Sequence, residues 1–374
     1  MSRRAVGRWW RTAIALVLLT GCGARSELYD DERPRAEDAG PRPFATFPCR
    51  WSLGRETVAR ELDLEPSSLV AGVRGGRAEV LILADGRGAV LTVADPPVRV
   101  REVDIFAVSQ VLTAPDAWVV VHRLDATACA LHLLDGDATS VRSEVTLGLG
   151  HFCTVTSRRA GALDVTAVSD SAAHLIEVHV RGETFEMAEP IDVVTGPIRR
   201  AVASSDATAG WVLATTTHDG AVGLRRVAGD GTVESRLGGL GAGDVFAAPD
   251  RLRSGLAVLR VEEPGRGVVE RAPLAGPLAV ERVADVPGPL APGESPIASN
   301  ETEALVSLRD GRVMAAALNG LEPSLIGPVT DAAEVHHVVV ALETGTSVGG
   351  VAYTYRERRD GPVRVAFRAL TCNR

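Results

Sequence analysis

The feature that most constrains the fold is a repeat of short apolar strand pairs separated by turn residues. From Pro48 onward, runs of Val, Leu and Ala alternate with Gly, Asp and Pro every 8 to 12 residues, which is typical of an all-β protein. The most apolar hairpin recurs every 38 to 49 residues. Its first strand begins near Val80, Trp118, Leu163, Trp211, Leu256, Leu305 and Val351, and its second strand near Gly88, Cys129, His174, Val222, Gly267, Arg312 and Val363.

The turns inside these hairpins keep the same register. Asp-Gly pairs, which tolerate the positive φ of tight turns, occupy four of them: Asp85-Gly86, Asp219-Gly220, Asp310-Gly311 and Asp360-Gly361. The pairs are 134, 91 and 50 residues apart, which corresponds to three, two and one repeats. Turns and strands therefore indicate the same repeated unit.

Seven such units, each with room for four strands, resemble a seven-bladed β-propeller. The resemblance implies an all-β fold of four-stranded antiparallel blades from residue 48 to residue 374. A β-helix would need a shorter period, and a pair of sandwiches would show no sevenfold register. A transmembrane barrel needs strands of about 9 to 11 residues and aromatic girdles, for which 5 Trp, 3 Tyr and 7 Phe are too few.

The resemblance also gives the cysteines a role. Propellers are commonly closed by an N-terminal strand that joins the last blade as its outermost strand. Residues 47–54 would then lie antiparallel to residues 363–372, with Cys49 opposite Cys372, which predicts a disulfide between them. Cys129 and Cys153 remain, on neighbouring units and near the same end of their strands, and form the second predicted pair. Four cysteines allow three pairings, and free thiols are the alternative.

The N-terminus has the sequence pattern expected of an export signal. Arg3, Arg4, Arg8 and Arg11 precede the apolar run 13–19 and the sequence Leu-Thr-Gly-Cys at 19–22. The apolar run is too short to span a bilayer, which needs about 20 residues. The segment resembles the lipobox of bacterial lipoproteins, which implies a signal peptide over residues 1–21 and lipidation of Cys22. Gly23 stands where an Asp would favour inner-membrane retention, so the resemblance implies the outer membrane. An ordinary signal peptide with an incidental Cys is the alternative.

Residues 22–47 are predicted to be a flexible tether. They mix acids, Arg and Pro and show no apolar periodicity, so they lack the apolar residues that a folded core requires. Removal of residues 1–21 would leave 36 basic and 48 acidic residues, a charge of −12. Nucleic acid is therefore not expected as a partner, because phosphate binding favours an excess of Lys and Arg.

A search for chemistry yields no catalytic, cofactor or metal residues. Residues 345–349 fit the G-x-S-x-G string, but a nucleophile elbow needs a helix after it, and an apolar strand is predicted there. His336 and His337 are adjacent on a predicted strand, so they should point to opposite faces and not share a metal. His151 and one of the two could meet in the central channel. Satisfied polar residues are the preferred interpretation of these and of His122, His132, His174 and His179, which are scattered among other predicted strands.

Two functions remain open. The first is a lipid-anchored, non-enzymatic binding module that presents loops to an envelope protein or polysaccharide. The second is a propeller hydrolase or lyase with its site at the mouth of the central channel. Topology predicts that the Asp-Gly turns share one face with the loops 238–243 and 286–296, and that Cys49 lies at the opposite end.

Overall fold

The computed structural model describes residues 49–373 with short gaps. The gaps fall at 64, 67, 75–76, 85–86, 94–98, 104–107, 115–116, 125–127, 136–139, 149, 151, 160, 207–209, 242, 251–254, 263–265, 292–295, 300–302, 319–321, 333 and 343–347. The chain divides into two units, Met1–Thr46 and Phe47–Arg374. The predicted signal peptide, Cys22 and the predicted tether lie outside the described residues, and all that follows concerns the second unit.

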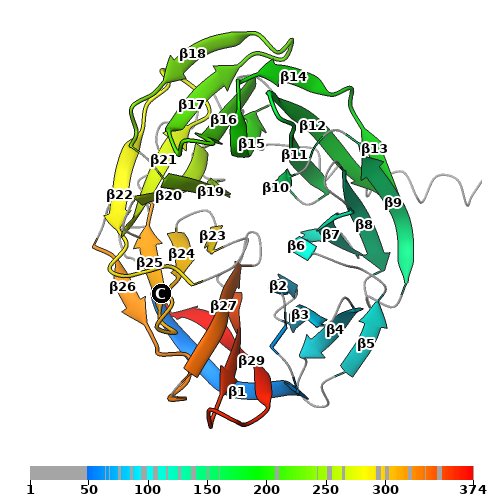
Figure 1. The fold of residues 1–374 in the computed structure, drawn as a ribbon, viewed down its shortest axis with the longest axis vertical. Coiled ribbons are helices and arrows are strands. Elements are labelled where there is room, and N and C mark those ends of the chain that lie inside the picture. The colour runs from blue at the N-terminus through cyan, green and yellow to red at the C-terminus, as the bar shows by residue number, and fades with distance from the viewer. Residues whose placement is uncertain are drawn as a thin grey trace, which may run out of the picture. The chain divides into compact units, whose positions relative to one another are not determined.

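The strands that the structure describes form seven antiparallel sheets arranged in a ring (Figure 1). The first three contain β2 (Ser68–Arg74), β3 (Arg77–Ala84), β4 (Arg87–Val93) and β5 (Arg99–Val103); β6 (Val108–Ala114), β7 (Ala117–Arg123), β8 (Cys129–Asp135) and β9 (Val141–Leu147); and β10 (Phe152–Arg159), β11 (Ala162–Val168), β12 (Ala172–Arg181), β13 (Thr184–Met187) and β14 (Ile191–Val194).

The next three contain β15 (Ile198–Asp206), β16 (Gly210–Thr217), β17 (Val222–Val227) and β18 (Val233–Leu237); β19 (Gly243–Asp250), β20 (Gly255–Glu262), β21 (Arg266–Pro273) and β22 (Glu281–Asp285); and β23 (Ile297–Ser299), β24 (Glu303–Ser307), β25 (Val313–Ala317) and β26 (Ser324–Ile326). The last sheet has the order β1-β29-β28-β27, with β27 (Glu334–Leu342), β28 (Val348–Arg356), β29 (Val363–Asn373) and β1 (Arg50–Leu62).

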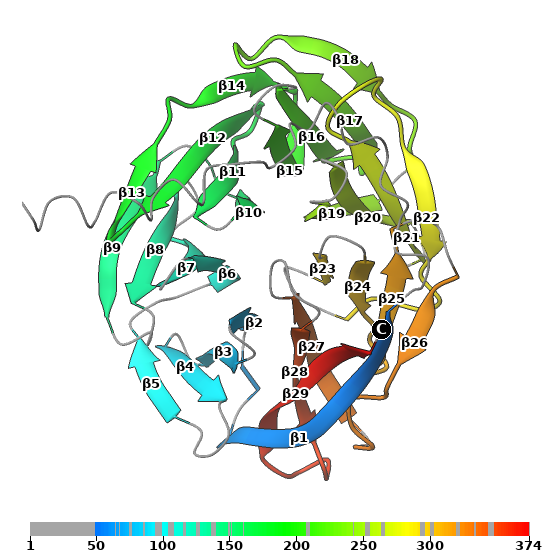
Figure 2. The same ribbon diagram turned by 180° about the vertical axis from the view of Figure 1, so that it is seen from behind.

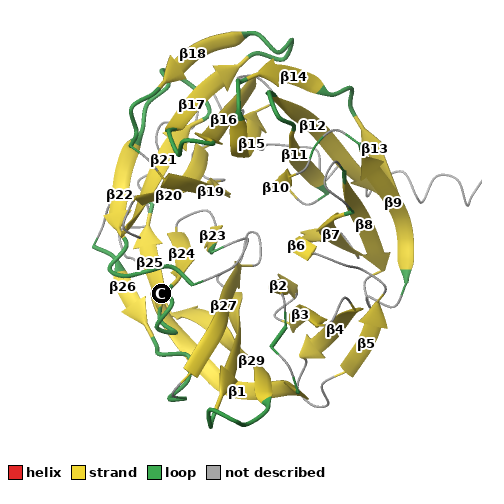
Figure 3. Ribbon diagram, in the orientation of Figure 1, coloured by secondary structure: helices red, strands yellow, loops and turns green. Residues whose placement is uncertain are grey.

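Each sheet runs from an innermost strand near the ring centre to an outermost strand at the rim. The innermost strands are β2, β6, β10, β15, β19, β23 and β27 (Figure 1). The hairpins predicted from the sequence are the second and third strands, from β3–β4 to β28–β29. Within the described residues every connection is a turn or loop (Figure 3). The prediction of an all-β propeller with four-stranded antiparallel blades is confirmed.

The third sheet departs from the pattern because its outer strand is interrupted. Arg181 to Val178 of β12 pair with β13, whereas Ala172 to Leu175 pair with β14. The interruption falls at residues 188–190, where Pro190 has no N–H to donate to a neighbouring strand. β13 and β14 therefore form one outer strand in two pieces.

β1 closes the ring by pairing antiparallel with β29 (Figure 2). Trp51 lies opposite Cys372, where Cys49 was predicted, so the register is displaced by two residues, and Leu62 lies opposite Val363. The N-terminal strand was predicted over residues 47–54, and the observed strand is longer, continuing to Leu62. It is the outermost strand of the last sheet, as predicted.

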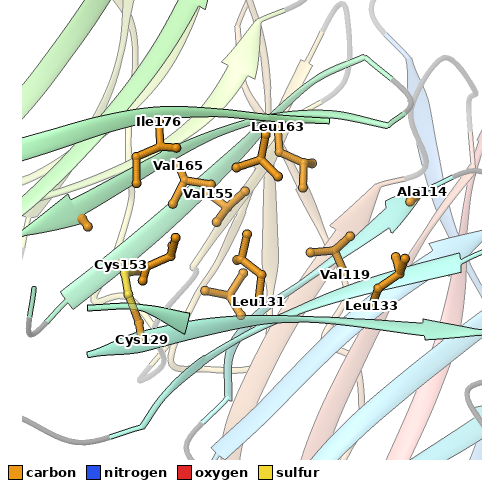
Figure 4. Packing of buried hydrophobic residues seen from close by; sticks show 14 of the residues in the cluster. Ala114, Val119, Cys129, Leu131, Leu133, Cys153, Val155, Leu163, Val165 and Ile176 are labelled. Carbon is orange, nitrogen blue, oxygen red and sulfur yellow. A yellow bond between two sulfur atoms is a disulfide. The ribbon is translucent and has the colours of Figure 1, made fainter. Parts of the chain in front are cut away.

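Both predicted cysteine pairs lie at disulfide distance. The Cα atoms of Cys49 and Cys372 are 5.4 Å apart and join the two ends of the described chain. The Cα atoms of Cys129 in β8 and Cys153 in β10 are 6.3 Å apart and link two neighbouring sheets (Figure 4).

The core lies between neighbouring sheets. Val119 and Leu131 of the second sheet pack against Val155, Leu163 and Ile176 of the third, and all five are at most 2% exposed (Figure 4). Both faces of a central strand are therefore buried, which explains the nearly unbroken apolar runs in the sequence.

Two carboxylates hold β1 in place. Glu303 of β24, which is 3% exposed, accepts hydrogen bonds from the Cys49 N–H (2.8 Å) and from Trp51 Nε1. Glu56 accepts hydrogen bonds from the hydroxyls of Tyr353 and Tyr355 in β28. Burial, together with the Glu56 carboxylate, raises the pKa of Tyr353. The closing strand is thus bonded through side chains both to its own sheet and to the preceding one.

Peptide mapping should find the two cysteine pairs as disulfides. We expect non-reducing digestion and mass spectrometry of protein isolated from an oxidising compartment to yield peptides joined through Cys49–Cys372 and Cys129–Cys153. A Cys49–Cys129 link would contradict the register of the ring.

Replacing Glu303 by alanine should destabilise the closed ring. The change leaves the buried Trp51 indole N–H and the partly buried Cys49 N–H without their charged acceptor, which should cost about 2–4 kcal/mol. Equilibrium urea unfolding measures this loss. Glu322→Ala, at an exposed loop position, is the matched control, and equal stability of the two variants would refute the role assigned to Glu303.

Candidate functional site

One end of the ring carries both the turns between second and third strands and the links between sheets; we call it the loop face. The Asp219-Gly220 turn contacts the link 238–243, because the Gly243 N–H donates to the Gly220 carbonyl (2.8 Å). In the same way, Arg309 N–H donates to the Pro289 carbonyl (2.9 Å) beside the Asp310-Gly311 turn. The predicted grouping of turns and links on one face is confirmed at these two places.

The Asp-Gly turns differ in backbone conformation. Gly220 and Gly311 have φ values of +86° and +81°, as expected for tight turns, whereas Gly361 is not in the left-handed region. Asp85-Gly86 lies outside the described residues. Hydrogen bonds from Thr217 and Ala221 lower the pKa of Asp219.

Three innermost strands contain an irregular register where they begin, at the loop face. The irregularities lie between Val108 and Gln110 in β6, between Ile198 and Arg200 in β15, and between Val335 and His337 in β27. A β-bulge adds a residue to one strand and changes the direction of its side chain. Each irregularity spans an apolar residue followed by two polar ones. The polar residues of β27 and β15 belong to the two clusters described next.

His336 and His337 both contact Glu65, in the link between β1 and β2. His336 Nδ1 is 3.3 Å from one carboxylate oxygen and His337 Nε2 is 3.5 Å from the other. His337 Nε2 also lies 3.2 Å from the Pro66 carbonyl oxygen. The prediction that the two histidines point to opposite faces is wrong, because the bulge interrupts the alternation of β27. His151 lies outside the described residues.

Arg200 lies over two aromatic rings from neighbouring innermost strands. Its guanidinium carbon is 4.8 Å from the ring centroid of Phe152, where β10 begins, and 4.3 Å from that of Phe246 in β19. Both distances are in the range of cation–π interactions. Arg199 beside it is exposed and donates from Nη2 to the Gly243 carbonyl (3.4 Å). Three successive sheets therefore contribute to one cluster, the Phe152–Arg200–Phe246 cluster.

A second histidine pair lies inside the second sheet. His122 Nε2 is 2.6 Å from His132 Nε2, and Glu144 Oε1 is 3.5 Å from the latter atom. Burial lowers the pKa of His132, an effect that the Glu144 carboxylate opposes. Metal-bound histidines donate their other N–H to a partner, but His132 Nδ1 is buried without a hydrogen-bond partner among the described residues. The pair is therefore best described as two imidazoles joined by a hydrogen bond between their Nε2 atoms.

The other sequence motifs have ordinary structural roles. His174 contacts Asp192 (2.6 Å) and His179 contacts Glu177 (2.9 Å), so both are satisfied polar residues, as interpreted from the sequence. Residues 345–347 of the G-x-S-x-G string lie outside the described residues, and strand β28 begins directly after them, at Val348, which does not fit a nucleophile elbow.

Within the described residues, no three or more His, Cys, Asp or Glu side chains are placed to hold a metal ion. The same part of the chain contains no helix that is long and apolar enough to cross a membrane.

Sequence reasoning missed Glu65, Phe152, Arg200 and Phe246. A signal for the bulges was present, because Val-Ser-Gln at 108–110, Ile-Arg-Arg at 198–200 and Val-His-His at 335–337 share one pattern. The three tripeptides occur at corresponding places in three units. This correspondence can be recognised only once the innermost strands and their pairing register are known.

Comparison with known proteins identifies the fold and no family. No family matches the chain, and no curated protein is similar to it in sequence. A chain in the crystal structure of a mitotic checkpoint complex is 13% identical, with a TM-score of 0.53 over 84% of this chain and 93% of the other. The β-propeller domain of Myceliophteria thermophila Cps50 (Swd1) is 8% identical, with a TM-score of 0.52 over 83% and 99%. A chain in the BBS1N–ARL6DN complex is 11% identical, with a TM-score of 0.53 over 87% and 98%.

Proposed function

We propose that the protein is an exported, lipid-anchored binding module of the cell envelope. Its signal peptide, residues 1–21, is removed, Cys22 is lipidated, and residues 22–47 tether the propeller domain, residues 48–374, to the outer membrane. The domain forms a ring of seven blades, one for each sheet. Its loop face binds an envelope protein or polysaccharide without catalysing a reaction, in the periplasm or at the cell surface.

The observation that carries this proposal is the Phe152–Arg200–Phe246 cluster on the loop face. Arginine and aromatic side chains are the types most enriched at the centres of binding interfaces. The chain enters the domain at Cys49, at the end opposite the loop face, because β29 runs from the Asp360-Gly361 turn to Cys372 at its far end. An anchor at that end leaves the loop face available to a partner.

Two further observations support an exported location and a non-nucleic-acid partner. Paired cysteines are typical of oxidising compartments, and both pairs here lie at disulfide distance. A mature charge of −12 disfavours phosphate backbones as partners.

Shortening the link 286–296 should weaken partner binding and preserve the fold. Ala291 N–H donates to the Ser307 carbonyl (3.0 Å), and Ser307 N–H donates to the Pro296 carbonyl (2.9 Å). Both ends of segment 292–295 are therefore held near one residue, and a single glycine can replace it. We expect an unchanged melting temperature and several-fold lower capture of partners by cross-linking in native membranes.

Asp230→Ala is the control for this experiment, because Asp230 lies in the turn between β17 and β18, at the end opposite the loop face. Equal capture by the shortened protein and by this control would contradict partner binding through the link.

A hydrolase or lyase is the second candidate, favoured by the group of Glu65, His336 and His337. A carboxylate beside two imidazoles can hold and transfer protons in general acid–base catalysis. If this function holds, purified protein should release soluble fragments from isolated envelope polysaccharide, and Glu65→Gln should lose that activity. Absence of fragments with the unaltered protein would exclude polysaccharide cleavage.

A further inference from the structure

Two arginines lie directly opposite each other on the two outer strands of the fourth sheet. Arg225 of β17 pairs with Arg236 of β18, so their side chains share one face of the sheet, and like charges placed in this way destabilise a strand pair. Leu213, which pairs with Arg225 on the other side, packs against the third sheet, so the arginines face that sheet. Among the described residues, neither arginine forms an ion pair with an acidic side chain.

The guanidinium group of Arg225 is only partly hydrogen-bonded. Its Nη2 donates to the Thr195 carbonyl (3.0 Å), in the link between the third and fourth sheets. Its Nη1 is buried and has no hydrogen-bond partner within the part of the chain that the structure describes. Burial, and next the charge of Arg236, lower the pKa of Arg225, although a guanidinium stays protonated. A charged donor that is buried without an acceptor is costly, so an acceptor from outside the chain would be stabilised here.

Two glycines leave open backbone beside the arginines. Gly223 precedes Arg225 by two residues and Gly238 follows Arg236 by two residues, so strand alternation places both on the same face as the arginines. A Cβ at Gly238 would meet no atom within 4 Å, and one at Gly223 would come no closer than 3.5 Å to its neighbours. A bound group can therefore approach the backbone of both strands.

This place lies at the rim of the ring, where the third and fourth sheets meet (Figure 1). Arg236 is exposed, and Val194, which precedes the residue that Arg225 contacts, is 76% exposed. A ligand can thus arrive from solvent. Because Nη1 is buried, the Arg225 side chain has to turn toward the two glycines to engage it, and the open space beside Gly223 permits this rotation.

We propose that the Arg225–Arg236 pair and the adjacent glycines bind a phosphate group. A phosphate monoester carries nearly two negative charges at neutral pH and offers three acceptor oxygens, which matches two guanidinium groups on separate strands. A carboxylate carries one charge and would leave the second arginine uncompensated. The site goes beyond the proposed function, because it lies on the outer strands and not at the Phe152–Arg200–Phe246 cluster on the innermost ones.

Binding of inorganic phosphate to the mature full chain tests the proposal. Isothermal titration calorimetry in excess chloride should show one saturable site, and phosphate should raise the melting temperature because it binds the folded state. Arg225→Gln and Arg236→Gln should each weaken binding at least tenfold. Arg181→Gln removes the same charge from β12, where the Arg181 side chain is 72% exposed and paired with Glu186, and should bind like the unaltered protein.

A second pair of variants keeps both arginines. Gly238→Leu places a side chain over the open backbone and should weaken phosphate binding at least tenfold, with an unchanged melting temperature in the absence of phosphate. Gly229→Leu is the matched control at the other end of the same hairpin. Both glycines are exposed, neither has a positive φ, and a Cβ at either would meet no atom within 4 Å. Gly229→Leu should bind phosphate normally.

Three outcomes would overturn the proposal: no saturable phosphate binding, equal binding by Arg225→Gln and Arg181→Gln, or equal stabilisation by acetate at matched ionic strength. If Arg225→Gln fails to fold, as its melting temperature reveals, equal binding by Gly238→Leu and Gly229→Leu overturns it instead. Competition identifies the source of a bound phosphate. Displacement by glucose 1-phosphate supports a soluble sugar phosphate, and displacement by phosphatidic acid vesicles supports a lipid headgroup.

Discussion

Strand β1 determines whether this domain is a ring, because it pairs with a strand at the other end of the chain. Cys49 and Cys372 are 323 residues apart in sequence, yet their Cα atoms are 5.4 Å apart. A disulfide there would restrict the unfolded chain and contribute on the order of 5 kcal/mol in the loop-closure account. The buried Glu303 side chain of the preceding sheet accepts two more hydrogen bonds from the N-terminal end of this segment, at Cys49 and Trp51. Closure thus combines backbone pairing, a covalent link and a buried carboxylate at one place.

The other sheet interfaces combine apolar packing with specific polar contacts. Buried Asp164 of β11 accepts hydrogen bonds from the Ser205 N–H (2.7 Å) and hydroxyl (2.8 Å) in the next sheet. Gln110 of β6 pairs with both backbone groups of Val155 (2.7 and 3.2 Å). Apolar packing between Val, Leu and Ala side chains is not directional, whereas these hydrogen bonds require one alignment of the two sheets. They therefore set the register between sheets on which the inner cluster depends.

The repeat made the fold predictable, whereas the site required contacts between units. The hairpins follow from the periodicity of the sequence, which acts within one unit. The closing strand and the cysteine pairs follow from the rules by which strands pair in a propeller, either between neighbouring units or between the two ends of the domain. Arg200 meets Phe152 and Phe246 across three units separated by about 50 residues each. Glu65 meets His337 across 272 residues. No local pattern encodes such meetings, because they depend on how each sheet is rotated against the next.

The bulges explain why strict alternation was misleading at the loop face. Alternation requires His336 and His337 to point apart, and the irregular register of β27 lets both reach Glu65. A bulge is not by itself a binding site, because the one in β6 accompanies Gln110, which bonds to the adjacent strand. What distinguishes β15 is the aromatic side chain on each neighbouring innermost strand. Phe152 and Phe246 contact Arg200 at the loop face. The corresponding polar residue of β6, Gln110, instead joins two sheets.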